Sequence, residues 1–146
     1  MAFSVMNKLF LLIGCLLSSW TIFAQEKQTT APPDNLLGVW QIVSQRLDNL
    51  EVILTECEQH STFTFTPTEI IENYYKMYNG NCVILNTNKE NYTVKGNHIF
   101  RKEETDLNNT FLIEGDTLTL SFLGKDEEGT EHIAVIVCKK AKPIEL

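Results

Sequence analysis

The chain has 146 residues, with 12 lysines and arginines against 19 aspartates and glutamates, so its formal net charge is −7 at pH 7. A net acidic chain repels polyphosphates and anionic lipid headgroups, which argues against nucleic acid and membrane surfaces as partners. A chain of this length is enough for a single domain that buries roughly two-thirds of its unfolded surface.

Residues 1–24 have the pattern of a secretory signal peptide. Lys8 supplies a positive start, Leu9 to Leu17 form an apolar core, and Ala24 ends a cleavage site of small residues. Met6 is an equally suitable start for this segment. The apolar run is shorter than the roughly 20 residues of a membrane-spanning helix, so we expect a secreted or periplasmic chain with no membrane insertion after cleavage.

The same segment has a second interpretation, because Leu12-Ile13-Gly14-Cys15 matches the pattern at which a bacterial cysteine is lipid-modified. In that case the chain would be a lipoprotein anchored at Cys15. A lipoprotein normally turns polar after this cysteine, whereas Leu16, Leu17 and Trp20 are apolar. We therefore favour the cleaved signal peptide.

Residues 25–35 are polar and include two prolines, which predicts a flexible linker. From residue 36 to residue 140 the chain alternates short β-prone runs with turn residues and shows no sustained helical periodicity. Residues 141–146 form a C-terminal tail. The predicted strands are Leu37–Arg46, Val52–Thr55, Ser61–Thr66, Glu69–Tyr78, Cys82–Leu85, Asn91–Lys95, Asn97–Lys102, Thr110–Ile113, Thr117–Leu123 and Thr130–Lys139.

Short turns join these strands, among them Asn79-Gly80-Asn81 and Glu114-Gly115-Asp116. Connections of this length force neighbouring strands to run antiparallel, which produces an up-and-down meander. About eight to ten such strands close into a barrel more readily than they stay open, because closure removes unpaired edges. The predicted fold is therefore all-β, an antiparallel meander closed into a barrel.

Alternation along a strand predicts which side chains face the barrel interior. Phe63 and Phe65 alternate with threonines, and Leu118, Leu120 and Phe122 alternate with threonine and serine. These five side chains are predicted to point inward. In the last strand both faces are apolar, so alternation does not assign its faces.

The strand Glu69–Tyr78 carries polar residues on both faces. We take Glu72 and Lys76 to mark its solvent side, which leaves four residues inward: Ile71, Asn73, Tyr75 and Met77. Tyr74 and Tyr78 then fall on the outer face. Exposed aromatic side chains there would form a protein-binding patch or simply cover the hairpin.

The inward apolar and aromatic side chains are the candidate lining of a ligand cavity: Phe63, Phe65, Tyr75, Met77, Tyr92, Phe111 and Phe122. An eight-stranded barrel is just wide enough to fill itself with side chains or to hold one small ligand. Asn73 or Tyr75 would then offer the ligand a polar group.

Three cysteines follow the signal segment. Cys57 and Cys82 flank the hairpin of residues 61–78, whose turn brings its two ends together, so we predict a disulfide between them in an oxidising compartment. Cys138 is left on the last strand. It is either a small buried hydrophobic residue or a barrel-lining thiol that reacts with a ligand, and no neighbouring histidine in the sequence activates it.

Catalytic and metal-binding motifs are absent from the sequence pattern. His60, His98 and His132 are isolated, and the spacing of Cys57 to His60 lacks a second pair of ligands. The acidic residues 126–128 lie in a glycine-bounded turn without the spacing of a calcium loop. The sequence therefore predicts a protein that is not an enzyme and holds neither metal nor cofactor.

Gly38-Val39-Trp40 opens the first predicted strand, where the glycine allows a close backbone approach and the tryptophan plugs the closed end of a barrel. With the meander and the paired cysteines, residues 36–140 resemble the lipocalin-like proteins of the calycin group, and more closely the compact secreted type found in bacteria. The resemblance implies a barrel with one open mouth and a cavity for a small apolar molecule. It also implies a basic residue packed over Trp40, for which Lys139 or Lys140 is the match, and we assign Lys139.

Two functions follow from this reasoning. The first is non-enzymatic binding of a small hydrophobic or amphipathic ligand inside the barrel. The alternative is a cell-envelope interaction or inhibitor protein that acts through exposed loops and has a filled barrel. An enzyme that depends on Cys138 is the least supported hypothesis.

Overall fold

The computed structural model describes residues 30–101 and 109–142. The predicted signal peptide, with the alternative anchor Cys15, and the first part of the predicted linker lie outside these residues. In the described part, no helix is long and apolar enough to cross a membrane. The described elements are β1 (Gly38–Leu47), β2 (Leu50–Val52), η1 (Glu58–His60), β3 (Thr62–Phe65), β4 (Glu69–Tyr78), β5 (Asn81–Lys95), β6 (His98–Arg101), β7 (Asn109–Glu114), β8 (Thr117–Lys125) and β9 (Glu131–Lys140).

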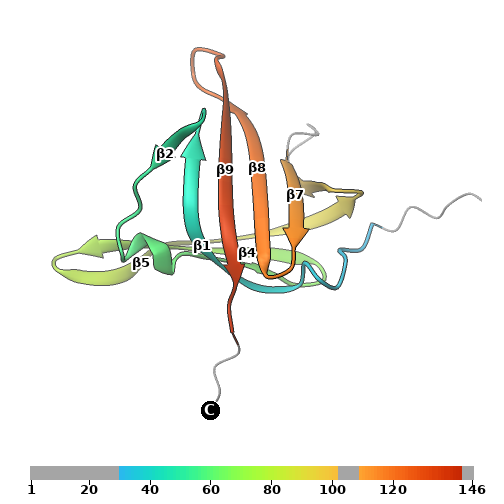
Figure 1. Cartoon of the computed structure of the whole chain (residues 1–146), viewed down its shortest axis with the longest axis horizontal. Helices are drawn as coiled ribbons and strands as arrows, with labels where there is room; N and C mark the ends of the chain where they lie inside the picture. The colour runs from blue at the N-terminus through green and yellow to red at the C-terminus, as the bar shows by residue number, and fades with distance from the viewer. Residues whose placement is uncertain (1–29, 102–108, 143–146) are drawn as a thin grey trace, which may run out of the picture.

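The nine strands of the described part form one antiparallel sheet in the order β2-β1-β3-β4-β5-β6-β7-β8-β9 (Figure 1). A further pairing joins β1 to β9, so the sheet closes into a ring. One edge of β1 is shared by β3 and the short β2, and the other edge is occupied by β9. The predicted antiparallel meander is therefore confirmed, together with its ring-like closure.

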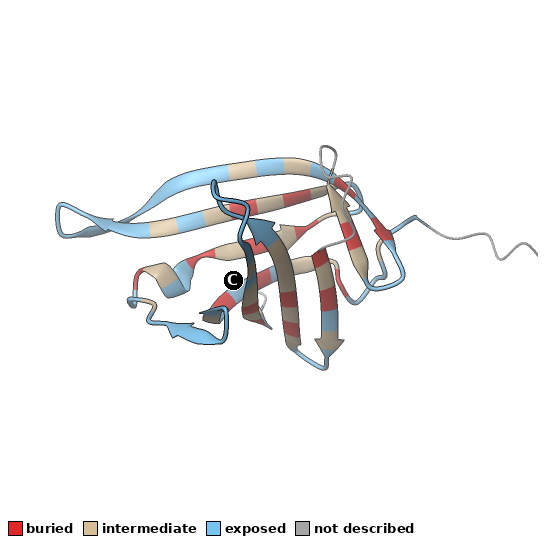
Figure 2. Cartoon of the chain, turned by 90° about the horizontal axis from the view of Figure 1, so that it is seen from above, coloured by how far each residue is buried: buried red, intermediate tan, exposed pale blue. Residues whose placement is uncertain are grey.

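Strand β5 is a single strand where the sequence pattern predicts two, because residues 86–90 are polar and have low β-propensity. These residues nevertheless pair with β4 in continuous register from Glu69↔Asn91 to Tyr74↔Asn86. Backbone pairing with a long partner strand thus outweighs local propensity. Since β3 and β6 cover only residues 70–73 of β4 and 92–95 of β5, the far end of the hairpin projects without a strand on either side (Figures 1 and 2).

The hydrophobic core fills the closed end of the ring. Its largest fully buried side chain is Trp40, whose indole nitrogen donates a hydrogen bond to the backbone oxygen of Leu36 at 2.8 Å. This bond satisfies the one polar atom of the tryptophan side chain. The other core side chains on strands come from every strand except the exposed β2: Ile42, Phe63, Phe65, Ile70, Tyr92, Val94, Ile99, Phe111, Leu118, Leu120, Ile136 and Cys138.

Lys140, and not the predicted Lys139, covers Trp40. Ile136 and Cys138 are buried on the inner face of β9, so alternation places residue 140 on that face and residue 139 outside. The Lys140 ammonium nitrogen lies 5.0 Å from the centre of the Trp40 ring, whereas that of Lys139 donates to the hydroxyl of Thr117. Gly38 precedes Trp40 with φ 118°, a backbone conformation that favours glycine because residues with a Cβ rarely adopt it.

Candidate functional site

Above this core the ring contains a cavity of about 530 Å³. A volume of this size lies in the range of roughly 300 to 1,000 Å³ that is typical of small-molecule sites. Its apolar lining consists of Leu47, Phe63, Phe122, Leu123, Ala134 and Ile136, together with Gly124. Its polar lining consists of Glu72, Tyr74, Arg101, Asn109, Lys125, Asp126 and His132.

An irregularity in β1 contributes to this lining. Trp40 and Ile42 face the interior, and the β1–β9 register shifts between Ile42 and Ser44. An extra residue at such a shift reverses the alternation of the strand. Leu47, an odd number of residues after Ile42, therefore also reaches the cavity.

The predicted faces of β4 are wrong. Ile70 and Glu72 are buried, and Glu72 and Tyr74 line the cavity, so Tyr75 and Met77 lie on the opposite face. The prediction assumed that a charged side chain faces water. A carboxylate can instead be buried when a cation and hydrogen-bond donors pair with it, and β6 supplies that cation to Glu72.

Arg101 is the centre of the polar wall of the cavity. Its guanidinium contacts the carboxylate of Glu72 and lies 3.3 Å from that of Glu90. The amide of Asn88 donates to both carboxylates, and the hydroxyl of Tyr74 donates to Glu72 at 3.2 Å. We call these five residues, Glu72, Tyr74, Asn88, Glu90 and Arg101, the Arg101 cluster.

Two further features characterise this cluster. Burial, followed by the nearby Glu72 carboxylate, raises the pKa of Tyr74 to about 12, so its hydroxyl keeps its proton and its hydrogen bond at neutral pH. The guanidinium carbon of Arg101 lies 5.7 Å from the centre of the Phe122 ring. The cluster therefore places a charged network directly against an aromatic wall.

His132 forms a second polar group of the cavity lining. Its Nδ1 lies 2.5 Å from Asp48 in the β1–β2 turn, and its Nε2 lies 3.0 Å from Asp126 in the β8–β9 loop. We call these three residues the His132 clasp. Both ring nitrogens can donate only when the imidazole is protonated, and the hydrogen bond to Asp48, followed by the one to Asp126, raises the pKa of His132. The hydrogen bonds from His132 likewise lower the pKa of both carboxyls.

The clasp is not a metal site. Asp48 and Asp126 lie against opposite edges of the imidazole, so the two carboxylates cannot meet at one ion. Among the described residues, no group of three or more histidine, cysteine, aspartate and glutamate side chains is arranged to hold a metal ion.

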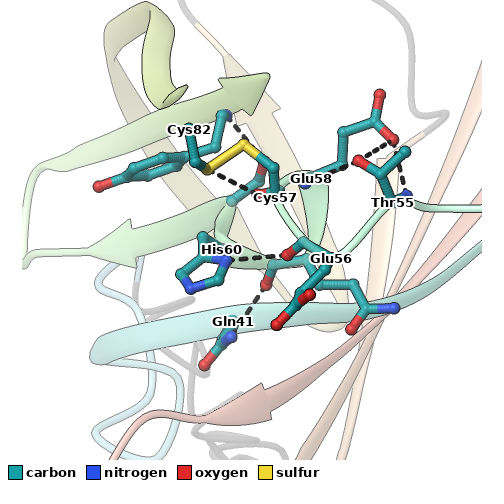
Figure 3. Close-up of a disulfide and its surroundings, with 10 residues drawn as sticks. Gln41, Thr55, Glu56, Cys57, Glu58, His60 and Cys82 are labelled. Carbon is teal, nitrogen blue, oxygen red and sulfur yellow. Dashed lines mark hydrogen bonds between the residues drawn. A yellow bond between two sulfur atoms is a disulfide. The ribbon is translucent and has the colours of Figure 1, made fainter. Parts of the chain in front are cut away.

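The predicted disulfide between Cys57 and Cys82 is present, with a Cα–Cα distance of 5.5 Å (Figure 3). It joins the connection before β3 to the start of β5. Hydrogen bonds between Thr55 and Glu58, and from His60 to the backbone oxygen of Glu56, order the same connection. Disulfides persist in oxidising compartments, so this bond is consistent with an extracellular protein.

The remaining predicted lining residues lie in three places. Phe63 and Phe122 line the cavity. Phe65, Tyr92 and Phe111 are buried in the core, where the rings of Phe65 and Tyr92 are 5.6 Å apart. Met77 instead lines a separate recess of about 370 Å³ beside the disulfide, and Tyr75 packs on His60, also outside the cavity.

The polar groups predicted for the ligand are also placed differently. Asn73 accepts a hydrogen bond from Thr87 and does not line the cavity, where Tyr74, Arg101 and His132 lie instead. Alternation from Ile99 is the one sequence signal for Arg101, because it puts both residues on one face of β6. No local pattern indicates that Asp48, Asp126 and His132 meet, since the two contacts of His132 span 84 and 6 residues.

Cys138 lies in the core and not in the cavity lining. Burial raises the pKa of its thiol to about 12. At neutral pH the nucleophilic thiolate is therefore nearly absent. This environment fits a small packing residue and not a reactive group.

An antiparallel ring of this kind, with a tryptophan at its closed end and a cavity above it, is a lipocalin-like fold. Residues 36–106 match the family model of the lipocalin-like domain. The match extends from the segment before β1 past the end of β6.

Among solved structures, the chain is similar to aphrodisin, a sex pheromone from female hamster, with 21% identity and a TM-score of 0.43. That alignment covers 75% of this chain and 77% of the other. It is also similar to a dog lipocalin allergen, with 16% identity, a TM-score of 0.44, and coverage of 75% and 76%. No curated protein matches the chain.

Proposed function

We propose that this protein binds one small amphipathic molecule in the cavity of its ring and does not act as an enzyme. The observation that carries the proposal is a cavity of about 530 Å³ in which an aromatic and aliphatic wall faces a hydrogen-bonded polar wall. A filled barrel would have no space for such a molecule. The lining therefore favours binding inside the ring over a purely structural interior.

The apolar wall would provide most of the binding free energy. Phe63, Phe122 and Ile136 present apolar surface to the cavity, and burying a ligand against them removes that surface from water. Each Å² of apolar surface removed contributes about 25 cal/mol. The Arg101 cluster and the His132 clasp would orient the polar end of the same molecule.

A pair of neighbouring substitutions tests this proposal. Ala134 lines the cavity beside Phe122, while the adjacent Ile133 points away and is 51% exposed. Ala134→Phe should fill the cavity and weaken binding of the neutral fluorescent probe N-phenyl-1-naphthylamine at least tenfold. Ile133→Phe, the matched control, should bind the probe like the unchanged protein. Equal binding by both variants would overturn the proposal.

Native mass spectrometry of the protein purified from its own host gives a second test. A retained small molecule should appear as an added mass that Ala134→Phe loses and Ile133→Phe keeps. The same samples test the thiol, because Cys138 should resist iodoacetamide in the folded protein and react only after unfolding. Rapid alkylation of folded protein would revive the Cys138 hypothesis.

The location of the mature chain is part of the proposal. We propose an exported protein of the compact bacterial type, with signal peptide 1–24, linker 25–35, domain 36–140 and tail 141–146. The Cys57–Cys82 disulfide supports export. The mass of the mature chain tests it, because cleavage leaves Gln25 at the N-terminus whereas the alternative leaves a lipid on Cys15.

A second candidate function is contact with another protein of the cell envelope through the projecting end of the β4–β5 hairpin. Residues 77–88 contain no charged side chain in a chain of net charge −7. Tyr78 and Leu85 are 66% and 64% exposed there, whereas Tyr74, predicted to share this patch, lines the cavity. Uncharged edges with exposed apolar residues are typical of pairing surfaces.

Photocrosslinking in cells tests this second candidate. A crosslinking residue at Leu85 should give one discrete product heavier than a dimer of this chain. The same residue at Leu112, which is exposed on β7, is the control and should give none. A product of dimer mass would indicate self-association, and its absence at both positions would overturn the candidate.

A further inference from the structure

We infer that the cavity prefers a ligand with a cationic head group over a neutral or anionic ligand of the same size. The inference rests on the proposed ligand-binding function and adds the chemical class of the ligand. An arginine in a binding site usually suggests an anionic ligand. Here the ion pairs of the cavity wall favour a cationic ligand instead.

Every cationic side chain that lines the cavity is held by carboxylates. Arg101 contacts Glu72 and Glu90, as described above. His132 contacts two aspartates, and Lys125 lies 3.5 Å from Glu131. Among the described residues, these three cationic groups pair with five carboxylates, so the paired groups together carry a formal charge of −2 with His132 protonated and −3 with it neutral. Two of the five, Glu72 and Asp126, line the cavity themselves, and the other three, Glu90, Asp48 and Glu131, pair with lining cations from outside the lining.

An anionic head group would meet an unfavourable environment here. To reach Arg101 it would have to displace Glu72 or Glu90, and Glu72 is nearly completely buried, with a side-chain exposure of 7%. A displaced carboxylate would remain inside the ring without its cation. Charges at a protein wall interact more strongly than in bulk water, so the excess negative charge of the paired groups repels an anionic head group.

A cationic head group would find acceptors and aromatic rings. Tyr74 donates its hydroxyl proton to Glu72, so the lone pairs of its oxygen are available as acceptors. The ring of Phe63, on the adjacent β3, also lines the cavity, and aromatic rings attract ammonium groups. The net charge of −7 on the whole chain also attracts a cationic ligand and repels an anionic one.

Competition among three ligands of equal chain length tests the inference. Decylammonium, decanol and decanoate are titrated below their micelle concentrations against bound N-phenyl-1-naphthylamine at low ionic strength. We expect decylammonium to displace the probe at a concentration at least tenfold lower than decanoate, with a smaller ratio at high salt. Decanoate competing as well as decylammonium would overturn the inference.

Two glutamates of the β4–β5 hairpin provide a matched pair of variants. Glu90→Gln removes a carboxylate that holds Arg101 and should reduce the ratio of decylammonium to decanoate affinity at least threefold. Glu69→Gln removes the carboxylate that pairs with Lys89, 3.2 Å away and outside the cavity lining, and should leave the ratio unchanged. An unchanged ratio in Glu90→Gln would also overturn the inference.

The outcomes separate this inference from the function on which it rests. Failure of the probe to bind, or equal binding by Ala134→Phe and the unchanged protein, would contradict binding in the cavity altogether. Probe binding that Ala134→Phe abolishes, without a preference for decylammonium, would retain the binding function and reject only its cationic specificity.

Discussion

The ammonium nitrogen of Lys140 lies 5.0 Å from the centre of the Trp40 ring and donates to the backbone oxygen of Asn35. One side chain of the last strand thus covers the first strand and the segment before it. Lys140→Met should lower the free energy of unfolding by about 1 kcal/mol, since it removes a cation–π contact. Urea denaturation measures this change.

Lys139→Met is the control for that experiment. Lys139 is adjacent, chemically identical and exposed, and we expect its replacement to change stability by less than about 0.5 kcal/mol. Equal effects of the two substitutions would show that the contact with Trp40 does not stabilise the floor of the ring.

The buried pair of Arg101 and Glu72 should contribute far more to stability than a surface pair. Arg101→Met leaves the Glu72 carboxylate inside the ring without its cation, and we expect a loss of about 3 kcal/mol. Lys89→Met, which breaks the exposed pair with Glu69, should cost less than about 1 kcal/mol. Denaturation midpoints of the two variants at pH 7 give the comparison, and similar midpoints would contradict it.

The Cys57–Cys82 disulfide closes a loop between residues 25 positions apart. In the chain-entropy model, such a crosslink stabilises the fold by about 3.5 kcal/mol. Reduction of the unchanged protein should therefore lower its denaturation midpoint to that of the double variant Cys57→Ser, Cys82→Ser. The double variant is its own control, because reductant should not shift it. A midpoint that is insensitive to reductant in both proteins would contradict the prediction.

The His132 clasp should make stability depend on pH at both ends of a window. The folded pKa of His132 is raised above its ordinary value of 6.5, so its contribution is complete below that value and is lost as pH rises through the folded pKa. The folded pKa values of Asp48 and Asp126 are lowered from 3.8, so their contribution is present above that value and is lost as pH falls. The clasp therefore stabilises most between these two limits.

Thermal denaturation across this pH range measures the effect of the clasp. His132→Gln should be less stable than the unchanged protein inside the window, and the difference should shrink above it. His98→Gln, on β6, is the control and should run parallel to the unchanged protein. NMR titration should give His132 a pKa above 6.5, and a value below 6.5 would contradict the assignment of the clasp.

Local patterns were sufficient wherever the environment of a residue is set by its neighbours in the chain. Alternation placed Phe63 and Phe65 correctly because hydrophobic side chains occupy one face and threonines the other. It failed for β4, because both faces of this strand carry polar residues. Which face is buried depends on Arg101 of β6, which pairs with Glu72. The low β-propensity of residues 86–90 also led to a prediction of two strands where β5 is one, because propensity contains no information about the partner strand.

The sequence by itself determined the all-β meander, the disulfide pair and the tryptophan floor, because each depends on turn chemistry, alternation or spacing along the chain. Only the tertiary structure decided that Glu72, Arg101 and His132 reach the cavity and that Lys140 covers Trp40. Burial of a charge depends on a partner that ring closure brings from a distant strand. The polar wall, and with it the proposed choice of ligand, therefore emerges from pairing between strands.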